Sequence, residues 1–391
     1  MYKFFILYVL SFSTLYGEWA EKTLETLTVQ EKIGQLFVVP ACPRYDKEII
    51  EQVIDRYHVG SVIVKQGHPL QQILFLNSLQ KRSKHPLLCT GDAEWGLGMR
   101  MEDTLSFPRN EVMGKVKNRF LLYLAGKEIG EQCRMVGIHL NFAPVVDVNN
   151  NPDNIIIGSR SFGSDPTQVS SCGYMLIQGM KQGRVLSCIK HFPGHGDTAI
   201  DSHKGLPEIP HSRSHLEEVE FVPFKYLIKT GVEAVMTGHL MMPALDEEFP
   251  ASLSQSIVTD LLQKEWGFRG LVITDALNMK ALTENYSVEE IAVKALLAGH
   301  DLLLYGAHRY EDVEMLLTEM IPKAYSAIEK AVERGEITEE LLNAHVLKVL
   351  QVKEDLGLHQ ERLTPLQDDL MERLHSEHAI DLIDRIKKGA L

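Results

Sequence analysis

Short, continuous runs of apolar residues recur along the chain, and segments with helical periodicity lie between them. The runs have the length of strands and are flanked by turn-forming residues, which predicts strands rather than buried helices. Strands are predicted at Leu36–Pro40, Ser61–Lys65, Leu87–Gly91, Leu140–Val145, Leu186–His191, Ala234–Gly238, Leu271–Asp275 and Leu302–Tyr305. Helices are predicted at Lys47–Tyr57, Leu70–Arg82, Asn118–Val136, Gln168–Gln182, Leu216–Thr230, Ile257–Trp266 and Val288–Leu297.

This alternation indicates an α/β protein with a parallel sheet that is buried on both faces. Eight strand–helix units favour a single (β/α)8 TIM-type barrel, and an open doubly wound sheet is the alternative. Further helices are expected over Glu311–Arg334 and Glu339–Leu356, packed outside the barrel. We therefore expect one barrel domain over residues 21–360 and a charged C-terminal tail over residues 361–391.

The first twenty residues have the layout of a secretory signal peptide. A basic start at Met1–Lys3 precedes an apolar run from Phe4 to Leu15, and small residues follow up to Ala20. The run is too short to span a membrane, so cleavage near Gly17 to Ala20 and export to the periplasm or medium are expected. A buried first strand or helix, in a cytoplasmic protein, is the alternative.

Composition and charge restrict the kinds of molecule that the protein is expected to bind. The chain of 391 residues has a net charge of −13 and contains no basic run, which argues against nucleic acid as a partner. The five cysteines are scattered through apolar segments without metal-type spacing, so they are expected in the core.

Polar residues stand at the ends of several predicted strands. Asp92, Asp147, His191, His239 and Asp275 each lie at or just past the carboxyl end of a different strand. In a (β/α)8 barrel these ends form one rim, where catalytic groups meet.

The most distinctive segment is Lys190-His191-Phe192-Pro193-Gly194-His195-Gly196-Asp197-Thr198, followed by Asp201-Ser202-His203. A polar, glycine-rich loop directly after a strand is typical of an active site. Asp201 and His203 can share a proton and form an acid/base dyad, whereas the alternative is a surface histidine beside an incidental aspartate.

Metal binding is a second alternative for this segment, since His191, His195, Asp197, Asp201 and His203 are all possible ligands. Because none of them shows the helical spacing of common zinc motifs, we expect no metal and no cofactor.

Four other residues are candidates with simpler alternatives. Asp275 ends a strand and is a potential nucleophile or a turn aspartate. Asp92, with Trp95 nearby, is placed to bind sugar hydroxyls or to close a turn. Lys190 binds a hydroxyl or shields carboxylates, and Arg160 lies in a glycine-bounded loop suited to oriented hydrogen bonds.

Together these segments resemble the glycoside hydrolase family 3 β-N-acetylglucosaminidases of bacterial cell-wall recycling. The likeness runs from about Leu27 to Gly357 and rests above all on the Lys190–His203 segment. Ile273-Thr274-Asp275, Gly158-Ser159-Arg160-Ser161-Phe162-Gly163 and Asn141-Phe142-Ala143-Pro144-Val145-Val146-Asp147-Val148 also look like segments of this family.

The resemblance implies a (β/α)8 barrel that hydrolyses β-glycosides with retention of configuration. By matching positions it implies Asp275 as nucleophile, His203 as general acid/base and Asp201 as the residue that orients His203. The residues implied to contact the sugar are Asp92, Arg100, Arg160, Lys190 and His191. A monomer acting on terminal N-acetylglucosamine of peptidoglycan fragments is expected.

The chain departs from the family pattern in one loop and in its leader. Many relatives carry Asp-x-Glu-Gly-Gly-Arg where this chain has Asp92-Ala93-Glu94-Trp95-Gly96-Leu97, so a different leaving-group side is expected. The leader is unusual beside cytoplasmic relatives, and no counterpart of the extra C-terminal domain of two-domain members is expected. Three other functions stay open: a phosphorylase, a metal-dependent hydrolase and a non-catalytic wall-binding protein.

Overall fold

The computed structural model describes residues 18–45, 47–198, 205–306 and 310–391. Eight parallel strands lie in the order β7-β6-β5-β4-β3-β2-β1-β8. Their bounds are β1 Phe37–Ala41, β2 Ser61–Val64, β3 Leu88–Gly91, β4 Leu140–Asn141, β5 Leu186–Phe192, β6 Ala234–Thr237, β7 Leu271–Thr274 and β8 Leu303–Leu304. Each predicted strand has a counterpart within a few residues of its expected bounds.

The sheet closes on itself. Strand β1 pairs with β2 on one side and with β8 on the other. The remaining seam is joined by a bridge between Ile273 of β7 and Leu302, and Thr274 N donates to Leu302 O at 3.1 Å. The predicted (β/α)8 barrel is confirmed, and the open doubly wound alternative is wrong.

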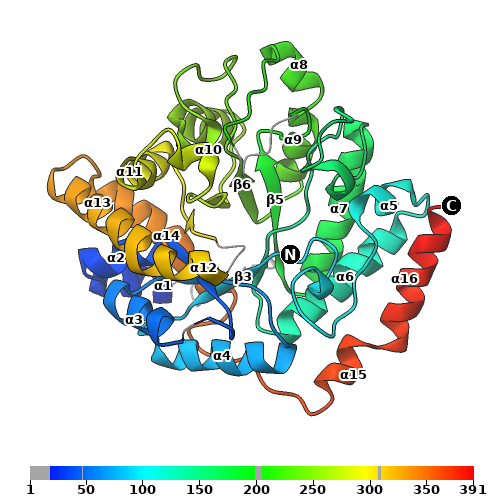
Figure 1. The fold of residues 1–391 in the computed structure, drawn as a ribbon, viewed down its shortest axis with the longest axis horizontal. Helices are drawn as coiled ribbons and strands as arrows, with labels where there is room; N and C mark the ends of the chain where they lie inside the picture. The colour runs from blue at the N-terminus through cyan, green and yellow to red at the C-terminus, as the bar shows by residue number, and fades with distance from the viewer. Residues whose placement is uncertain (1–17, 46, 199–204, 307–309) are drawn as a thin grey trace, which may run out of the picture.

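Helices surround the barrel on all sides in Figure 1. Those before and within the barrel are α1 Glu18–Thr26, α2 Val29–Gln35, α3 Lys47–Tyr57, α4 Pro69–Arg82, α5 Asn110–Lys115, α6 Phe120–Met135, α7 Pro166–Gln182, α8 Arg213–Glu218, α9 Phe221–Lys229, α10 Lys280–Thr283 and α11 Val288–Ala298. The π-helical segment η4 Ser256–Glu265 stands between β6 and β7, and short 3-10 turns occur at η1 Leu97–Met99, η2 Gly158–Arg160 and η3 Ala251–Leu253. After β8 come α12 Tyr310–Met315, the π-helical turn η5 Leu316–Met320, α13 Ile321–Glu333, α14 Glu339–Asp355, α15 Leu370–Leu374 and α16 Glu377–Gly389.

Apolar side chains form two cores, one inside the barrel and one between the barrel and its helices. The inner core takes Val38, Ile63, Leu88 and Leu140 from successive strands. Because successive side chains of a strand point to opposite faces, a barrel strand must be apolar on both. This explains why the strands are continuous apolar runs. All five cysteines are buried, as predicted.

Helix α14 covers the amino-terminal end of the barrel. Val349 and Leu358 belong to the inner core, and the buried Nζ of Lys353 donates to Oε1 of Gln35, just before β1, at 2.7 Å. The carboxylate of Glu354 accepts from the backbone amides of Trp19 at 3.0 Å and Ala20 at 3.2 Å. The two ends of the barrel region are thereby joined.

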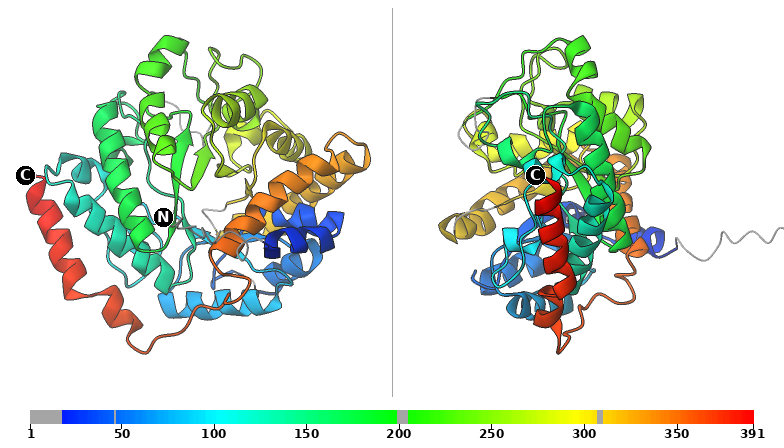
Figure 2. Two further views of the ribbon diagram at one scale, coloured as in Figure 1. Left: turned by 180° about the vertical axis from the view of Figure 1, so that it is seen from behind. Right: turned by 90° about the vertical axis from the view of Figure 1, so that its right-hand side faces the viewer.

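The segment 361–391, predicted as a charged tail, contains α15 and α16. Both views of Figure 2 place α16 along the outside of the molecule, beside α5 and α6. It buries Leu382, Ile383 and Ile386 on the face toward the barrel helices. The predicted leader lies outside the described residues except for Glu18 to Ala20. Among the described helices, none is both long and apolar enough to cross a bilayer.

Candidate active site

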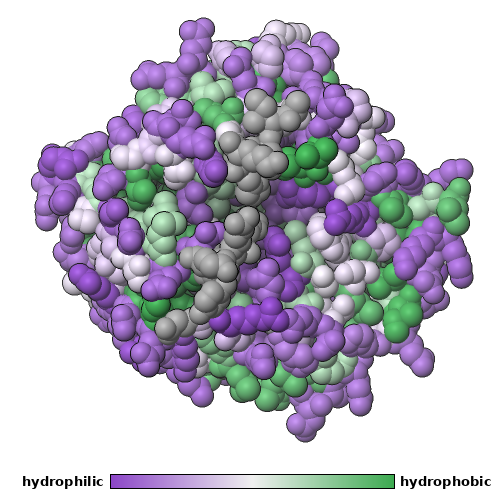
Figure 3. Space-filling model, viewed as in Figure 1, coloured by the Kyte–Doolittle hydropathy of each residue, from purple (hydrophilic) through white to green (hydrophobic). Residues whose placement is uncertain are grey.

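A cavity of about 240 Å³ lies at the carboxyl ends of the strands. Its walls carry six of the eight predicted site residues, Asp92, Arg100, Arg160, Lys190, His191 and Asp275. Its apolar surface includes Ile63, Phe142, Met236 and Leu304. Figure 3 shows a hollow with hydrophilic walls near the centre of the face turned to the viewer. The other two predicted residues, Asp201 and His203, lie outside the described residues.

Strand β5 contributes two consecutive residues to this cavity, Lys190 and His191. Neighbouring residues of a regular strand would face opposite sides of the sheet. The pairing of β5 with β6 shifts register between Ile189 and Phe192, an irregularity of the kind that re-aims side chains next to active sites.

Asp92 is surrounded by three cations. Its carboxylate lies 2.9 Å from Arg100 Nη2, 3.1 Å from Lys190 Nζ and 3.8 Å from Lys65 Nζ. Burial alone would raise the pKa of Asp92, but Lys190, Arg100 and Lys65 outweigh it and hold the pKa well below its usual range. The carboxylate is therefore a fixed hydrogen-bond acceptor for hydroxyl groups.

Glu94 lines the cavity and pairs with Arg160 and Lys190. Two parallel hydrogen bonds from Arg160, at 3.0 Å and 2.7 Å, hold the carboxylate, and Lys190 Nζ lies 2.8 Å from the same group. Although burial opposes the charged form, Arg160 and Lys190 lower the pKa of Glu94 to about 2. Such a bidentate pair fixes the guanidinium of Arg160 in one orientation.

His191 is held by the buried carboxylate of Asp147. The ring Nδ1 lies 2.8 Å from Asp147 Oδ2, and the amide of His191 donates to the same carboxylate at 3.1 Å. Burial would raise the pKa of Asp147, but the neighbouring His191 and His195 lower it. The other ring nitrogen, Nε2, lies 3.4 Å from Arg160 Nη2. Asp147 therefore orients His191 toward the cavity.

Asp275 follows β7 at the cavity wall and is half-buried. Among the described residues its side chain has one hydrogen-bond donor, the amide of Ala276 at 2.7 Å. Burial acts to raise the pKa of Asp275, but His191, His239, the Ala276 amide and Lys190 together lower it to about 2. An ionised carboxylate with few hydrogen bonds is chemically suited to act as a nucleophile.

The loop after β5 is braced up to Thr198, the last described residue before the gap. Asn154 Nδ2 donates to the carbonyls of His195 and Gly196 at 2.8 Å and 3.0 Å. His195 is buried; burial and the neighbouring His191 lower its pKa to about 4. The imidazole of His195 is therefore neutral near pH 7.

Among the described cavity residues, sequence reasoning missed two charged ones, Glu94 and Lys65. Lys65 ends the second predicted strand. Its position at the rim could therefore have been predicted from the same strand-end pattern that identified Asp92. Burial lowers the pKa of Lys65 to about 8, with Asp92 acting in the opposite direction. Glu94 gave no such signal, because its partners Arg160 and Lys190 are distant in sequence.

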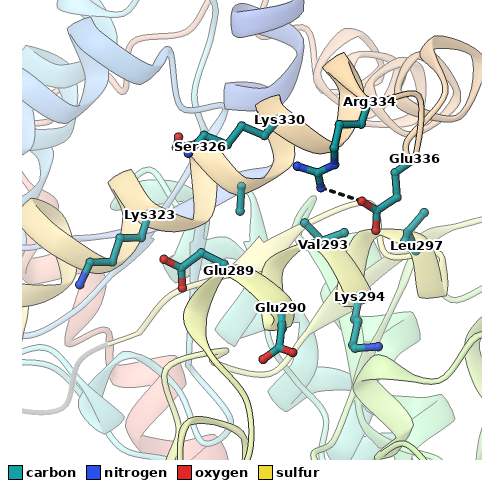
Figure 4. Close-up of a pocket in the computed structure, with 11 residues that line it drawn as sticks. Glu289, Glu290, Val293, Lys294, Leu297, Lys323, Ser326, Lys330, Arg334 and Glu336 are labelled. Carbon is teal, nitrogen blue, oxygen red and sulfur yellow. Dashed lines mark hydrogen bonds and ion pairs between the residues drawn. The ribbon is translucent and has the colours of Figure 1, made fainter.

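A larger cavity of about 560 Å³ lies on the outer surface, between α11 and α13. Figure 4 shows Glu289 of α11 on the side of Lys323 of α13, whereas the carboxylate of Glu290 points away from α13. This groove is lined by helix side chains away from the strand ends, where barrel enzymes place their chemistry. The smaller, charged cavity is the candidate active site.

A closed (β/α)8 barrel with ionised carboxylates and cations at its carboxyl-end rim defines an enzyme of the TIM-barrel class that handles polar substrates. The sequence profile described as "Glycosyl hydrolase family 3 N terminal domain" matches residues 28–352. The chain belongs to glycosyl hydrolase family 3, which confirms the family resemblance.

Several relatives have similar sequences or structures. Beta-hexosaminidase A of Pseudoalteromonas piscicida is 30% identical over 373 residues, covering 88% of this chain and 62% of that protein. Beta-hexosaminidase LpqI of Mycobacterium tuberculosis is 31% identical over 339 residues, 84% of this chain and 83% of that protein. The glycoside hydrolase family 3 beta-N-acetylglucosaminidase structure from Paenibacillus sp. str. FPU-7 superposes with a TM-score of 0.85 and 35% identity, over 93% of this chain and 69% of that one. The chain thus spans less than two thirds of the first relative's length.

Proposed function

We propose that this protein is a retaining exo-β-N-acetylglucosaminidase that removes terminal N-acetylglucosamine from peptidoglycan fragments. The observation that carries the proposal is the half-buried, ionised Asp275 at the wall of a cavity already lined by hydroxyl-binding groups. The names of the relatives from Pseudoalteromonas and Paenibacillus support the same activity.

The reaction takes place in two steps. Asp275 attacks the anomeric carbon and forms a covalent glycosyl ester, while protonated His203 donates its proton to the departing glycosidic oxygen. Neutral His203 then takes a proton from water, which attacks the same carbon and releases Asp275. Asp201 accepts a hydrogen bond from His203 and fixes the tautomer that faces the substrate.

The sugar is held by Asp92, Arg100, Arg160, Lys190 and His191. The cations on Asp92 keep its carboxylate ionised, and Glu94 keeps Arg160 aligned, so both remain ready to bind hydroxyl or amide groups. The cavity of about 240 Å³ is smaller than the roughly 300–1,000 Å³ of sites for drug-sized ligands. This size supports removal of one terminal sugar at a time.

We further propose a monomeric, exported enzyme whose leader is residues 1–20, with a catalytic domain over 21–360 and a C-terminal segment over 361–391. Mass spectrometry of the protein secreted or retained by its native host tests this assignment. A mature chain that begins at Met1 would contradict it.

The direct test is hydrolysis of an aryl β-N-acetylglucosaminide by the full chain and by Asp275→Ala. We expect turnover by the wild type, loss in the variant and partial recovery with added azide. Robust turnover by Asp275→Ala without added nucleophile would falsify the assignment of the nucleophile. The aryl β-glucoside is the matched substrate control, and comparable rates on both would contradict the specificity for the N-acetyl group.

A second measurement separates hydrolysis from phosphorolysis. The reaction is run in phosphate and in an inert buffer, and the sugar product is identified. Free N-acetylglucosamine in both buffers is expected. Formation of N-acetylglucosamine 1-phosphate would make the protein a phosphorylase with the same covalent intermediate.

A further inference from the structure

Two histidines and a glutamate meet next to the loop that follows β5. His211 lies just before α8, His215 lies in its first turn, and Glu220 directly precedes α9. One potential ligand atom from each of the three lies within 4.8 Å of the other two. The two imidazole rings are 4.0 Å apart between centroids and inclined by 32°.

The carboxylate of Glu220 lacks a full set of partners. The residue is 1% exposed, and its Oε2 has no hydrogen-bond partner within the described part of the chain. Its other oxygen is 3.4 Å from Asn150 Nδ2 and 3.7 Å from His215 Nε2. The same ring nitrogen of His215 is also buried and without a hydrogen bond among the described residues. Buried polar atoms without hydrogen bonds are costly and require a partner. One bound cation would be a partner for both the Glu220 carboxylate and the His215 ring nitrogen.

We propose that His211, His215 and Glu220 bind one divalent transition-metal ion of the zinc type. Two imidazole nitrogens and one carboxylate oxygen are the donors that zinc takes in three-ligand protein sites, with water in the fourth position. Magnesium and calcium prefer sites made entirely of oxygen donors, so the two histidines disfavour them.

The site adjoins the loop that leads into the proposed acid/base dyad. Asp197 Oδ2 lies 2.6 Å from His211 Nε2, and a side chain at Gly194 would place its Cβ 2.7 Å from Cβ of Glu220. A bound ion would therefore fasten this loop to the ends of α8 and α9. None of the three ligands is among the described residues that line the active-site cavity.

Metal binding to the chelator-treated full chain tests the proposal without an activity assay. Titration with ZnCl2 by calorimetry, and the visible absorption of the CoCl2-loaded protein, are expected to show one equivalent per chain. His211→Ala, His215→Ala and Glu220→Gln should each abolish this binding. Asp197→Asn, which alters only a group beside His211, should weaken binding about 10- to 100-fold. Zinc should also raise the melting temperature of the wild type and not of His215→Ala.

Two controls separate this site from other histidines. His378→Ala changes an exposed residue of α16 and should bind zinc like the wild type. His203→Ala should also retain one equivalent, which excludes the dyad as the source of the signal. His211 and His215 are half-buried, and circular dichroism checks that their variants fold. The proposal is overturned if the wild type binds no stoichiometric zinc, or if folded His211→Ala and His215→Ala bind it as tightly as the wild type.

Discussion

Glu94 connects the charged groups of the cavity although it is almost completely buried. It pairs with Arg160 and with Lys190, and Lys190 in turn pairs with Asp92. The burial that penalises each charge is offset only while all partners are present. Loss of one carboxylate therefore leaves a buried cation uncompensated and frees Arg160 to move.

Glu94→Gln tests this role. We expect the free energy of unfolding to fall by about 3 kcal/mol, because a charge is removed from a buried pair. The kcat/KM for the aryl N-acetylglucosaminide should fall as well. Urea unfolding and steady-state kinetics measure the two effects. Glu336→Gln is the control, since its pair with Arg334 is exposed and should contribute at most about 1 kcal/mol.

If Asp201 and His203 form the acid/base dyad, substitution of His203 should affect substrates with poor and good leaving groups to different extents. Asp201→Ala should retain the fold and slow turnover by about 10²-fold or more, because His203 loses the partner that orients it. His203→Ala should slow hydrolysis of an alkyl glycoside far more than that of an activated aryl glycoside, since only the former departs as a poor, unprotonated alkoxide. Equal slowing of both substrates would assign His203 a structural role, and His195 would be the next candidate.

The sequence predicted the site where local pattern and chemistry coincide. Asp92, Lys190, His191 and Asp275 stand at strand ends, so the fold alone brings them together. Arg100 was predicted through the family resemblance alone, Arg160 also from its glycine-bounded loop, and both line the cavity. Glu94 was missed because its function depends on pairs across the barrel. His211 and His215 were not singled out, because His211 precedes α8 and the two histidines therefore do not form the helical pair of common zinc motifs.

At the scale of single elements, α16 differs most from the prediction, because its segment was expected to be a charged tail. Although α16 is rich in charged residues, one of its faces is apolar, and Leu382 on that face is fully buried against the barrel helices. The residues between α14 and α15 contribute their own contacts, including a hydrogen bond from Asn77 Nδ2 to Thr364 O at 2.7 Å. The helix is thus part of the packed structure.

Leu382→Ala should lower the free energy of unfolding by about 2–4 kcal/mol, as expected for a truncated core leucine. Activity at a permissive temperature should not change, because α16 packs on α5 and α6 rather than on the cavity. Ile380→Ala on the same helix is the matched control, since Ile380 is 46% exposed and should have little effect. Equal destabilisation by the two substitutions would contradict the observed packing.

The carboxyl end of strand β4 could not be predicted from the sequence. The apolar run predicts a strand over Leu140–Val145, yet the regular pairing ends at Asn141. Pro144 interrupts it, because proline has no amide hydrogen to donate to a neighbouring strand. Beyond Asn141 the backbone contacts are irregular: the amide of Phe142 donates to Gly91 O at 2.8 Å, the amide of Cys188 donates to Ala143 O at 3.0 Å, and Val145 forms an isolated bridge with Lys190. Existence and order of the strands were predictable from hydrophobic pattern, whereas their ends depend on partners.

At the scale of the whole molecule, Lys353 makes stability depend on pH. Burial lowers its pKa to about 7 in the folded state, from the ordinary 10.5 expected in the unfolded chain. Between these values the unfolded state binds more protons, so the contribution of Lys353 to stability rises with pH from about 7 to about 10.5 and is constant below about 7.

Lys353→Met should remove this dependence. The wild type is expected to gain up to about 1.4 kcal/mol per pH unit over the variant between pH 7 and 10. Urea unfolding at several pH values gives the difference, and Lys330→Met, at an exposed position of α13, serves as the control. Parallel pH profiles for wild type and Lys353→Met would show that the buried amine stays charged.

The closure of the barrel has a consequence for how the protein is made. Strand β1 acquires its second neighbour only when β8 exists, and the amide of Trp19 bonds to Glu354, 335 residues later. While the ribosome is still synthesising the chain, β1 presents an open edge, and open edges invite pairing with other chains. Emergence of β8 ends this exposure, and α14 follows it. Newly made protein should therefore depend on chaperones late in translation, and truncation before β8 should yield aggregates rather than a smaller barrel.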